Sequence, residues 1–586
     1  MTNLEKIGRR FPRFAPALRD SLKEDYGRAG LLQDFWAGLS VGIIALPLSL
    51  ALAIASGVPP QHGLYTAIIA GAIAALAGGS RFNVTGPTAA FVVILHPIAV
   101  AHGIGGLLMA TLMSGAILVA MGWGRMGQLI SYIPHSVTTG FTAGIAIVIA
   151  SLQIKDFLGL LPVDVPENFF GRLTALGAAL PTLNPGEAGL GLATLALLII
   201  WPRLRTPIPA YLVGAVFAGL ASFALGHWWP EFHVTTIADR FSYLLDGTVR
   251  AGIPQLPPQF AWPWNLTAVG HAPLMLSFAL LKELAGPAFA IAMLGAIESL
   301  LCAVIADGMT GKKHDPDAEL VAQGLGNLVA PLFGGIPATG ALARTAANIR
   351  AGARSPIAAV IHALFILVAM LTIAPLLSWL PMCGLAALLL MVAWNMSERK
   401  NFRNILRVAP RTDVILMLLC FTLTVLVDMV TAISVGVVLA ALEFMHRMAK
   451  LSLVKMISEG EADAPVGLPK DVRYYTIAGP LFFGAAERAV SALRNHDRNV
   501  RAVILDLAAV PTIDITGLVA LQSVIDELLA AGIFVAICSA QRNVLRVLRE
   551  GGYRKREGQL WYFASVAAAV QRLRLPPVNP QGALRS

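Results

Sequence analysis

The sequence predicts an α-helical polytopic membrane protein, with 14 membrane segments arranged as 7+7 inverted repeats and a small α/β domain after them. Apolar residues make up 56% of the 586 residues and charged residues 13%, with a mean hydropathy of +0.70. A soluble domain carries about 25% charged residues, so the bilayer must be the solvent for most of this chain. An internal repeat and a change of pattern after residue 450 predict the rest of the architecture.

Composition also narrows the classes of function. Cys302, Cys383, Cys420 and Cys538 are scattered, which favours neither a disulfide framework nor a metal cluster. Lys and Arg on cytoplasmic loops explain the net charge of +10, so we expect no nucleic-acid partner. The sequence contains no glycine-rich phosphate loop, metal-ligand spacing or nucleophile–base motif, and we expect no enzyme activity, metal or cofactor.

Fourteen apolar stretches follow one another, and a membrane helix needs about 20 such residues. They span 35–56, 64–79, 87–100, 104–123, 136–152, 188–203, 208–226, 283–306, 319–332, 339–350, 357–378, 381–397, 412–428 and 430–446. The third and the tenth stretches are too short to cross fully. We therefore expect these two to be half-helices.

The charged loops predict the orientation. No apolar stretch precedes Arg28 that could act as a signal peptide, so we expect segment 1–30 to be cytoplasmic. Even-numbered membrane segments then return the chain to the cytoplasm, where Lys and Arg collect. The cations on these loops are Arg125, Arg203, Arg205, Lys312, Lys313, Arg350, Arg354, Arg399, Lys400, Arg403, Arg407 and Arg411. Both termini are predicted to be cytoplasmic.

The pattern changes after the transmembrane domain, which we place at 31–450. A polar linker at 451–468 precedes alternating strands and helices, which indicate a small α/β domain at 469–575 and a tail at 576–586. The predicted strands are Val472–Ile477, Ala502–Leu507 and Gly532–Cys538, and the predicted helices are Ala485–Asn495 and Gly517–Ala531.

The membrane part repeats itself. The first segment places Pro47 ten residues before a closing glycine, Gly57, and the eighth segment places Glu298 ten residues before Gly308. Later in each half, two glycines and an extended stretch lead to a Thr-Gly pair and a short apolar helix. The two pairs are Thr85–Gly86 and Thr339–Gly340. Seven segments, an odd number, separate the copies, so the two repeats must be inverted in the membrane.

Interrupted helices at mid-membrane provide a way to bind an anion. Non-helical backbone at that depth is tolerated only beside protein or a water-filled cavity. A half-helix points its free N–H groups and its positive dipole end into that cavity. Two such ends facing each other would form an anion site, as in transporters built from inverted repeats. The alternative is that these glycines only allow close helix packing.

Four further stretches make the chain similar to a known family over nearly its whole length. They are Gln153–Gly159, Met293–Cys302, Gly324–Asn327 and Met391–Ser397. Together they resemble the SulP family of anion transporters with a C-terminal STAS domain, and within it the bacterial C4-dicarboxylate transporters. The resemblance implies core and gate domains that move like an elevator, a pocket between the third and tenth helices, and a homodimer in the bacterial inner (plasma) membrane.

The resemblance and the repeat together predict the substrate-binding residues. They are Ser49, Gly86, Pro87, Thr88, Ala89, Thr339, Gly340, Ala341 and Arg344. Thr88, Thr339 and Gly340 are expected to offer hydroxyl and backbone donors. Many relatives carry a Gln after the proline of the first segment, where this chain has Leu48 and Ser49. Ser49 therefore supplies a shorter donor, or the donor is missing.

Glu298 is the predicted site of proton or cation coupling. An ionisable side chain inside a membrane segment costs at least ~2.5–3.5 kcal/mol on insertion scales, so a functional role is the first interpretation. Protonation would remove its charge from beside the anion pocket and favour the substrate. The alternative is a structural ion pair with Arg344 or Lys282. Arg344 is expected to contact substrate or balance Glu298, unless it extends to a membrane edge.

Asp514 and Thr516 are the candidate regulatory residues of the α/β domain. In STAS domains of the anti-sigma-antagonist type, a phosphorylatable Ser or Thr often follows this Asp, whereas here the next residue is Ile515. We therefore expect a scaffold role, or docking of a cytoplasmic protein partner, in preference to a phosphorylation switch.

Three functions remain. The first is proton-coupled uptake of C4-dicarboxylates such as succinate, fumarate or aspartate. The second is transport of sulfate or bicarbonate, with sodium as an alternative coupling ion. The third is a non-transporting membrane sensor whose output is the STAS domain. A sensor has no need of paired half-helices and a buried carboxylate, which places it last.

Overall fold

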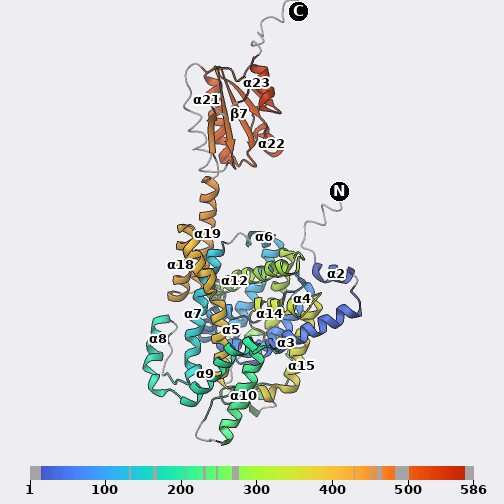
Figure 1. The fold of residues 1–586 in the computed structure, drawn as a ribbon, viewed down its shortest axis with the longest axis vertical. Coiled ribbons are helices and arrows are strands. Elements are labelled where there is room, and N and C mark those ends of the chain that lie inside the picture. The colour runs from blue at the N-terminus through green and yellow to red at the C-terminus, as the bar shows by residue number, and fades with distance from the viewer. Residues whose placement is uncertain are drawn as a thin grey trace, which may run out of the picture. The chain divides into compact units, whose positions relative to one another are not determined.

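A computed structural model describes residues 15–24, 26–130, 134–162, 166, 168–204, 206, 208–228, 233–245, 248–266, 276–427, 429–450, 453–457, 465–481 and 500–574. The chain divides into two compact units, Met1–Ala440 and Ala441–Ser586. The first unit is helical, and the second is built around a sheet (Figure 1). The predicted helix Ala485–Asn495 and the predicted tail 576–586 lie outside the described residues.

Within the described ranges, helices coincide with all fourteen predicted membrane segments (Figure 1). They are α3 (Arg28–Ala55), α4 (Gln61–Ala77), α5 (Ala89–Trp123), α7 (His135–Leu158), α9 (Pro185–Ile200), α10 (Ala210–Trp228), α12 (Phe278–Thr310), α13 (Pro316–Val329), α14 (Leu342–Arg350), α15 (Ile357–Leu377), α16 (Met382–Met396), α18 (Arg411–Leu426) and α19 (Met429–Lys450). The α5 helix holds two segments, because Gly103 has non-helical angles (φ 64°, ψ −170°). Among the described residues, seven helices are long and apolar enough to cross a membrane. The predicted fold class is confirmed.

The membrane helices pack into two groups, which correspond to the expected core and gate. One group contains α3, α4, α5, α12, α13, α14 and α15. The other contains α7, α9, α10, α16 and α18. Each group takes helices from both halves of the sequence, as an inverted repeat requires.

The structure fixes the register of the repeat, which the sequence predicts only to within about three residues. Gly57 follows α3 with a φ of 83°, and the matching glycine after α12 is Gly311, with a φ of 72°. The predicted Gly308 lies inside α12 instead. Glycine occupies positive φ without steric cost, so it marks where each helix ends. In this register the Thr of the Thr-Gly pair comes 28 positions after this glycine in both halves.

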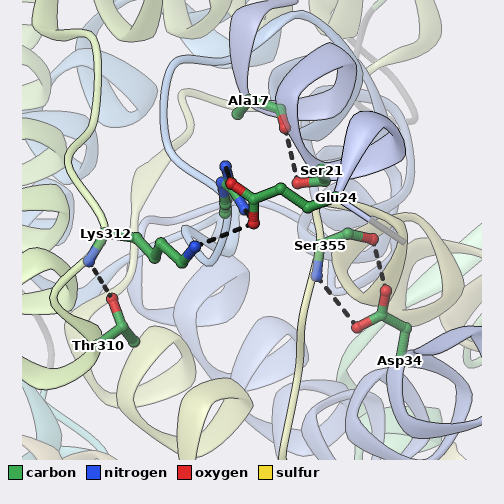
Figure 2. A network of polar contacts seen from close by, with 8 residues as sticks. Ala17, Ser21, Glu24, Asp34, Thr310, Lys312 and Ser355 are labelled. Atoms are coloured by element: carbon green, nitrogen blue, oxygen red, sulfur yellow. Dashed lines mark hydrogen bonds and ion pairs between the residues drawn. The ribbon is translucent and has the colours of Figure 1, made fainter. Parts of the chain in front are cut away.

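Shorter elements complete the first unit. They are α2 (Pro16–Lys23), α6 (Gly127–Ile130), α8 (Phe169–Ala178), α11 (Ile237–Arg240), the hairpin of β2 (Ser242–Leu245) and β3 (Thr248–Ala251), and α17 (Arg399–Val408). The N-terminal α2 is held to the core group by the residue that follows it (Figure 2). Glu24 accepts hydrogen bonds from Arg81 at 2.7 and 2.8 Å and from Lys312 at 2.9 Å.

Beside this contact, Asp34 of α3 accepts hydrogen bonds from the backbone amide of Ser355 at 3.2 Å and from the Ser355 hydroxyl (Figure 2). The backbone amide of Arg354 donates to the same carboxylate at 2.6 Å. Tyr26 donates to the same carboxylate at 2.6 Å. Asp34 is fully buried, and these donors compensate the loss of its hydration. They attach α3 to the loop before α15.

The second unit contains a five-stranded sheet of order β5-β6-β7-β8-β9. Its elements are β5 (Leu453–Ile457), β6 (Val472–Ala478), β7 (Ala502–Ala509), α21 (Ile515–Ala530), β8 (Phe534–Cys538), α22 (Arg542–Glu550), β9 (Leu560–Phe563) and α23 (Val566–Arg574). The strands are parallel except for β5, which pairs antiparallel with β6. The range expected to be a linker therefore contains the first strand of this sheet, because backbone pairing satisfies its amides.

Candidate functional site

The two Thr-Gly pairs of the repeat contact each other. They form the two-residue strands β1 (Thr85–Gly86) and β4 (Thr339–Gly340), which pair antiparallel with Thr85 opposite Gly340 and Gly86 opposite Thr339. The amide of Ala341 donates to the carbonyl of Val84 at 2.9 Å and extends the pairing. The symmetry of the repeat thus places the starts of both half-helices in one region of the core group.

Each half-helix begins directly after its strand. Thr88 precedes α5 and Ala341 precedes α14, both with extended backbone, and neither caps its own helix with its side chain. The first amides of a helix have no partner within the helix. These two N-termini therefore offer backbone donors and a positive dipole end to an anion.

Glu298 of α12 is hydrogen-bonded to one of these N-termini. The Thr88 hydroxyl donates to its Oε2 at 3.0 Å, and Glu298 remains half-buried. Within the described part of the chain, no ion pair joins Glu298 to Arg344 or Lys282. The described residues therefore contain no direct ion pair at Glu298, although the charge of Arg344 acts on it electrostatically.

Arg344 lies in the first turn of α14, because that helix begins at Leu342. Its Nη2 donates to the carbonyl of Pro87, whereas its Nη1 is buried with no partner among the described residues. A Cβ on Gly86 would collide with Nη1, so only glycine lets the guanidinium approach β1 this closely. One buried, charged donor is thus left free beside the start of α5.

Thr339 and Gly340 do not offer the donors expected of them. The Thr339 hydroxyl donates to the carbonyl of Gly295 at 2.9 Å, and the amide of Gly340 donates to the Ser299 hydroxyl at 3.0 Å. The Ser299 and Thr339 hydroxyls are 2.7 Å apart. Both predicted donors are therefore used to attach β4 to α12, because a buried donor without an acceptor would be costly.

The other predicted substrate-binding residues are buried near these contacts or on α3. Gly86, Pro87, Ala89 and Ala341 are buried at the strand-to-helix junctions. Ser49 lies two residues after Pro47 in α3, is fully buried, and its hydroxyl has no partner among the described residues. The hydrogen bonds of the described residues do not join Ser49 to Glu298 or Arg344.

Sequence reasoning missed the polar network that supports β1. Glu319 of α13 accepts hydrogen bonds from the amides of Gly79 and Ser80, both at 3.0 Å, from Asn83 Nδ2 at 2.7 Å and from Gln323 Nε2 at 3.0 Å. Gln323 also donates to Thr85 of β1 at 2.7 Å. Two further bonds link the network to α14: the Thr345 hydroxyl donates to Asn83 at 3.0 Å and accepts from the Val84 amide at 3.1 Å.

Glu298 is therefore not the only carboxylate inside the membrane unit. Asp34, Glu187 and Glu319 are each at most 4% exposed. A signal was available for Glu319, which stands at the start of a predicted membrane segment, but its donors come from loops that only the fold brings near. Among the described residues, no group of three His, Cys, Asp or Glu side chains could hold a metal ion.

In the second unit, Asp514 has a structural role at the start of α21. Its Oδ1 accepts from the amide of Gly517 at 2.7 Å, the bond of a helix N-cap. Ile515 is 72% exposed, and Thr516 beside it is exposed as well. The two candidate regulatory residues thus lie at the start of α21, and the hydroxyl-bearing residue, Thr516, is exposed.

Comparison with known proteins gives a consistent result. A model of the sulfate permease family matches residues 31–420, and a model of the STAS domain matches residues 466–569. The protein YvdB of Bacillus subtilis is 36% identical over 535 residues, which cover 91% of this chain and 96% of that protein. The bicarbonate transporter BicA of a Picosynechococcus species is 30% identical over 556 residues, covering 91% of each chain.

Among solved structures, the murine Solute Carrier 26 family member A9 anion transporter, in its inward-facing state, is similar to this chain with a TM-score of 0.78. The match covers 94% of this chain and 91% of the murine chain at 19% sequence identity. At that identity the likeness concerns the fold. It shows that a helical membrane domain followed by a STAS domain is shared.

Proposed function

Because the chain belongs to the sulfate permease family, we propose that it is a secondary active transporter that takes up C4-dicarboxylates together with protons. The hydrogen bond from Thr88 to Glu298 carries this proposal. It joins a group that can take up a proton to the half-helix that would hold the anion. No step requires bond chemistry on the substrate, so the protein acts as a carrier and not as an enzyme.

The charges of the site support a dianionic substrate. Two helix N-termini and the free Nη1 of Arg344 provide positive potential at the pocket. An ionised Glu298 opposes that potential, and a protonated Glu298 does not. The anion therefore binds more tightly when Glu298 is protonated, and Glu298 takes up a proton more readily when the anion is bound. This mutual coupling is the thermodynamic condition for symport.

The side chains of α3 limit the length of substrate that the site can accept. Many relatives carry a Gln after the proline of this helix, where this chain has Leu48 and Ser49, and the buried Ser49 hydroxyl has no partner among the described residues. Because α3 packs against both half-helices, we infer that the absence of a Gln side chain leaves more room between them. A four-carbon diacid can use that room, with one carboxylate near Arg344 and the other within reach of Ser49.

Transport of sulfate or bicarbonate is the second candidate, favoured by the family's name and by the name of the relative BicA. In that case the Glu298 carboxylate and the Thr88 hydroxyl are the oxygen ligands available to a sodium ion.

We further propose a homodimer in the bacterial inner membrane, with both termini in the cytoplasm. The cation-rich loops support that orientation.

Counterflow into proteoliposomes tests the proposal. Vesicles loaded with unlabelled succinate, sulfate or bicarbonate are diluted into the corresponding labelled anion. We expect exchange of succinate, and accumulation when an inward proton gradient is imposed. Exchange of sulfate or bicarbonate alone, or accumulation that follows a sodium gradient, would favour the second candidate. A folded protein that exchanges none of the three would favour the sensor.

A further inference from the structure

The α17 helix, which connects α16 to α18, has two chemically distinct sides. At 3.6 residues per turn its four cations fall within about 100° of arc, and no apolar side chain shares that arc. The cations are Arg399, Lys400, Arg403 and Arg407. The apolar side chains Phe402, Ile405, Leu406 and Val408 occupy the rest of the circumference together with two asparagines. This pattern is typical of a helix at a membrane surface.

Packing orients the cations away from the protein. The Phe402 ring meets Phe421 of α18 edge to face, with ring centroids 5.8 Å apart. Phe402 and Ile405 are half-buried, and α17 packs against α7 and α18. The four cations are all exposed. The cationic side of α17 therefore faces the surroundings of the membrane unit and not its interior.

No carboxylate of the described chain neutralises these charges. None of the ion pairs found among the described residues includes Arg399, Lys400, Arg403 or Arg407. The adjoining Glu398 accepts a hydrogen bond from Asn401 at 3.0 Å instead. Four like charges within two and a half turns repel each other, so an anionic surface outside the chain would stabilise them.

Neighbouring side chains indicate that this surface is a membrane interface. Trp394 of α16 is 56% exposed, and the Arg399 guanidinium lies 3.4 Å from the centroid of its ring. Tryptophan is enriched where headgroups meet the hydrocarbon core. Leu406 and Val408 are 44% and 76% exposed, next to the cations. Acyl chains next to the headgroups would cover these apolar groups.

We propose that α17 is a docking surface for the phosphate headgroups of anionic phospholipids such as phosphatidylglycerol. Guanidinium groups match phosphate oxygens in a bidentate geometry. The apolar side of α17 contacts the protein and the acyl chains, and the cationic side contacts headgroups. Lipid bound there would fix the connection between α16 and α18, two helices of the gate group.

A double variant with a matched control tests this surface. Arg403→Gln/Arg407→Gln removes two cations four residues apart on α17. Arg542→Gln/Arg546→Gln removes two exposed cations with the same spacing on α22, in the second unit. The full-length proteins are titrated with phosphatidylglycerol in phosphatidylcholine micelles, and thermal stability is followed. Each cation near an anionic surface contributes about a fivefold factor in affinity, so we expect the α17 variant to need at least about tenfold more phosphatidylglycerol.

The control variant should respond like the wild type. Salt provides a measurement that needs no variant: 0.5 M NaCl should weaken the wild-type response at least about tenfold, because exposed charges are screened. An unchanged response of the α17 variant would overturn the proposal. So would stabilisation by inorganic phosphate at the same phosphate concentration, or loss of the response after removal of the second unit. The last result would show that the lipid acts through the second unit and not through α17.

Discussion

Glu298 and Glu319 lie on the consecutive helices α12 and α13 but have different surroundings. Glu319 uses its two oxygens to accept four hydrogen bonds from loops and side chains around β1. Glu298 accepts one hydrogen bond, from Thr88. A change of charge on Glu319 would disturb the scaffold of the site. The same change on Glu298 would alter one contact at the start of α5, which suits a coupling residue.

Replacing Glu298 with Gln should preserve substrate binding and abolish proton-driven accumulation. The amide is close in size to the protonated acid and carries no titratable proton. Uptake into proteoliposomes with and without an inward proton gradient checks this, with binding measured separately by calorimetry. Glu283→Gln is the matched control, because Glu283 is on the same helix and its side chain is 66% exposed. Unchanged accumulation in the Glu298 variant would remove this residue from the mechanism.

Glu24 provides a pH-dependent contact between the N-terminal segment and the core group (Figure 2). Hydrogen bonds from Arg81 and then from Lys312 lower the pKa of Glu24 from 4.5 to about 2. A lowered pKa contributes stability that is present above pH 4.5 and is lost as the pH falls toward 2.

We therefore expect Glu24→Gln to lower the melting temperature at pH 7, and the difference from wild type to shrink between pH 4.5 and pH 2. Differential scanning fluorimetry over that range measures it. Because the Glu24 side chain is 51% exposed, we expect a small difference at pH 7. A difference that stays constant down to the lowest pH would show that Glu24 contributes by packing and not by charge.

At the scale of elements, the pairing of β1 with β4 makes the two half-helices one structural device. Each strand is only two residues long, and its partner lies in the other half of the sequence. Side chains of α12, α13 and α14 form hydrogen bonds with the two strands or with the residue before β1. The positions of the two helix N-termini are therefore coupled, and a disturbance on one strand should reach both.

Gly86→Val and Gly340→Val should each weaken substrate binding by at least ~1 kcal/mol, the scale of one lost hydrogen bond. A Cβ on Gly86 would displace the Arg344 guanidinium, and a Cβ on Gly340 would lie 2.7 Å from the Asn83 amide. Equilibrium binding of labelled succinate measures the effect. Gly189→Val on α9 is the control, since no atom lies within 4 Å of its Cβ position. Native affinity in both test variants would place the pocket elsewhere.

At the scale of the molecule, the membrane unit contains every residue proposed to bind substrate. Both half-helices, Glu298 and Arg344 precede the end of α19 at Lys450. The second unit has its own apolar core on both faces of its sheet. Each unit therefore has the packing that an independent fold requires.

A chain truncated after Lys450 should still insert and bind substrate, although its rate or its oligomer stability could fall. Thr516→Ala should change transport by no more than about twofold, or ~0.4 kcal/mol. Binding to the purified truncated protein and uptake by the full-length variant measure the two effects. A truncated protein that is monodisperse and folded but binds no substrate would show that the second unit helps to form the site.

The sequence by itself determined the membrane class, the fourteen segments, the α/β domain and the repeated Thr-Gly pairs. These features depend on local properties: the length of apolar stretches, the period of strands, and glycine before a helix. It also indicated Glu298, because a charge within an apolar segment is visible without a fold. The register of the repeat could be read only to within about three residues, since glycines are frequent, and of Gly308 and Gly311 only Gly311 adopts a positive φ.

The tertiary structure alone decided which donors are free. The sequence predicts Thr339 and Gly340 as donors to the substrate, but in the structure they donate to Gly295 and Ser299 of α12. In the sequence Glu319 stands at the edge of a predicted membrane segment, and only the structure shows that a loop from the other half of the chain supplies its donors. The physical reason is the same in both cases. Whether a buried polar group binds ligand or protein depends on partners that lie 41 to 240 positions away in the sequence, and only folding brings those partners into contact.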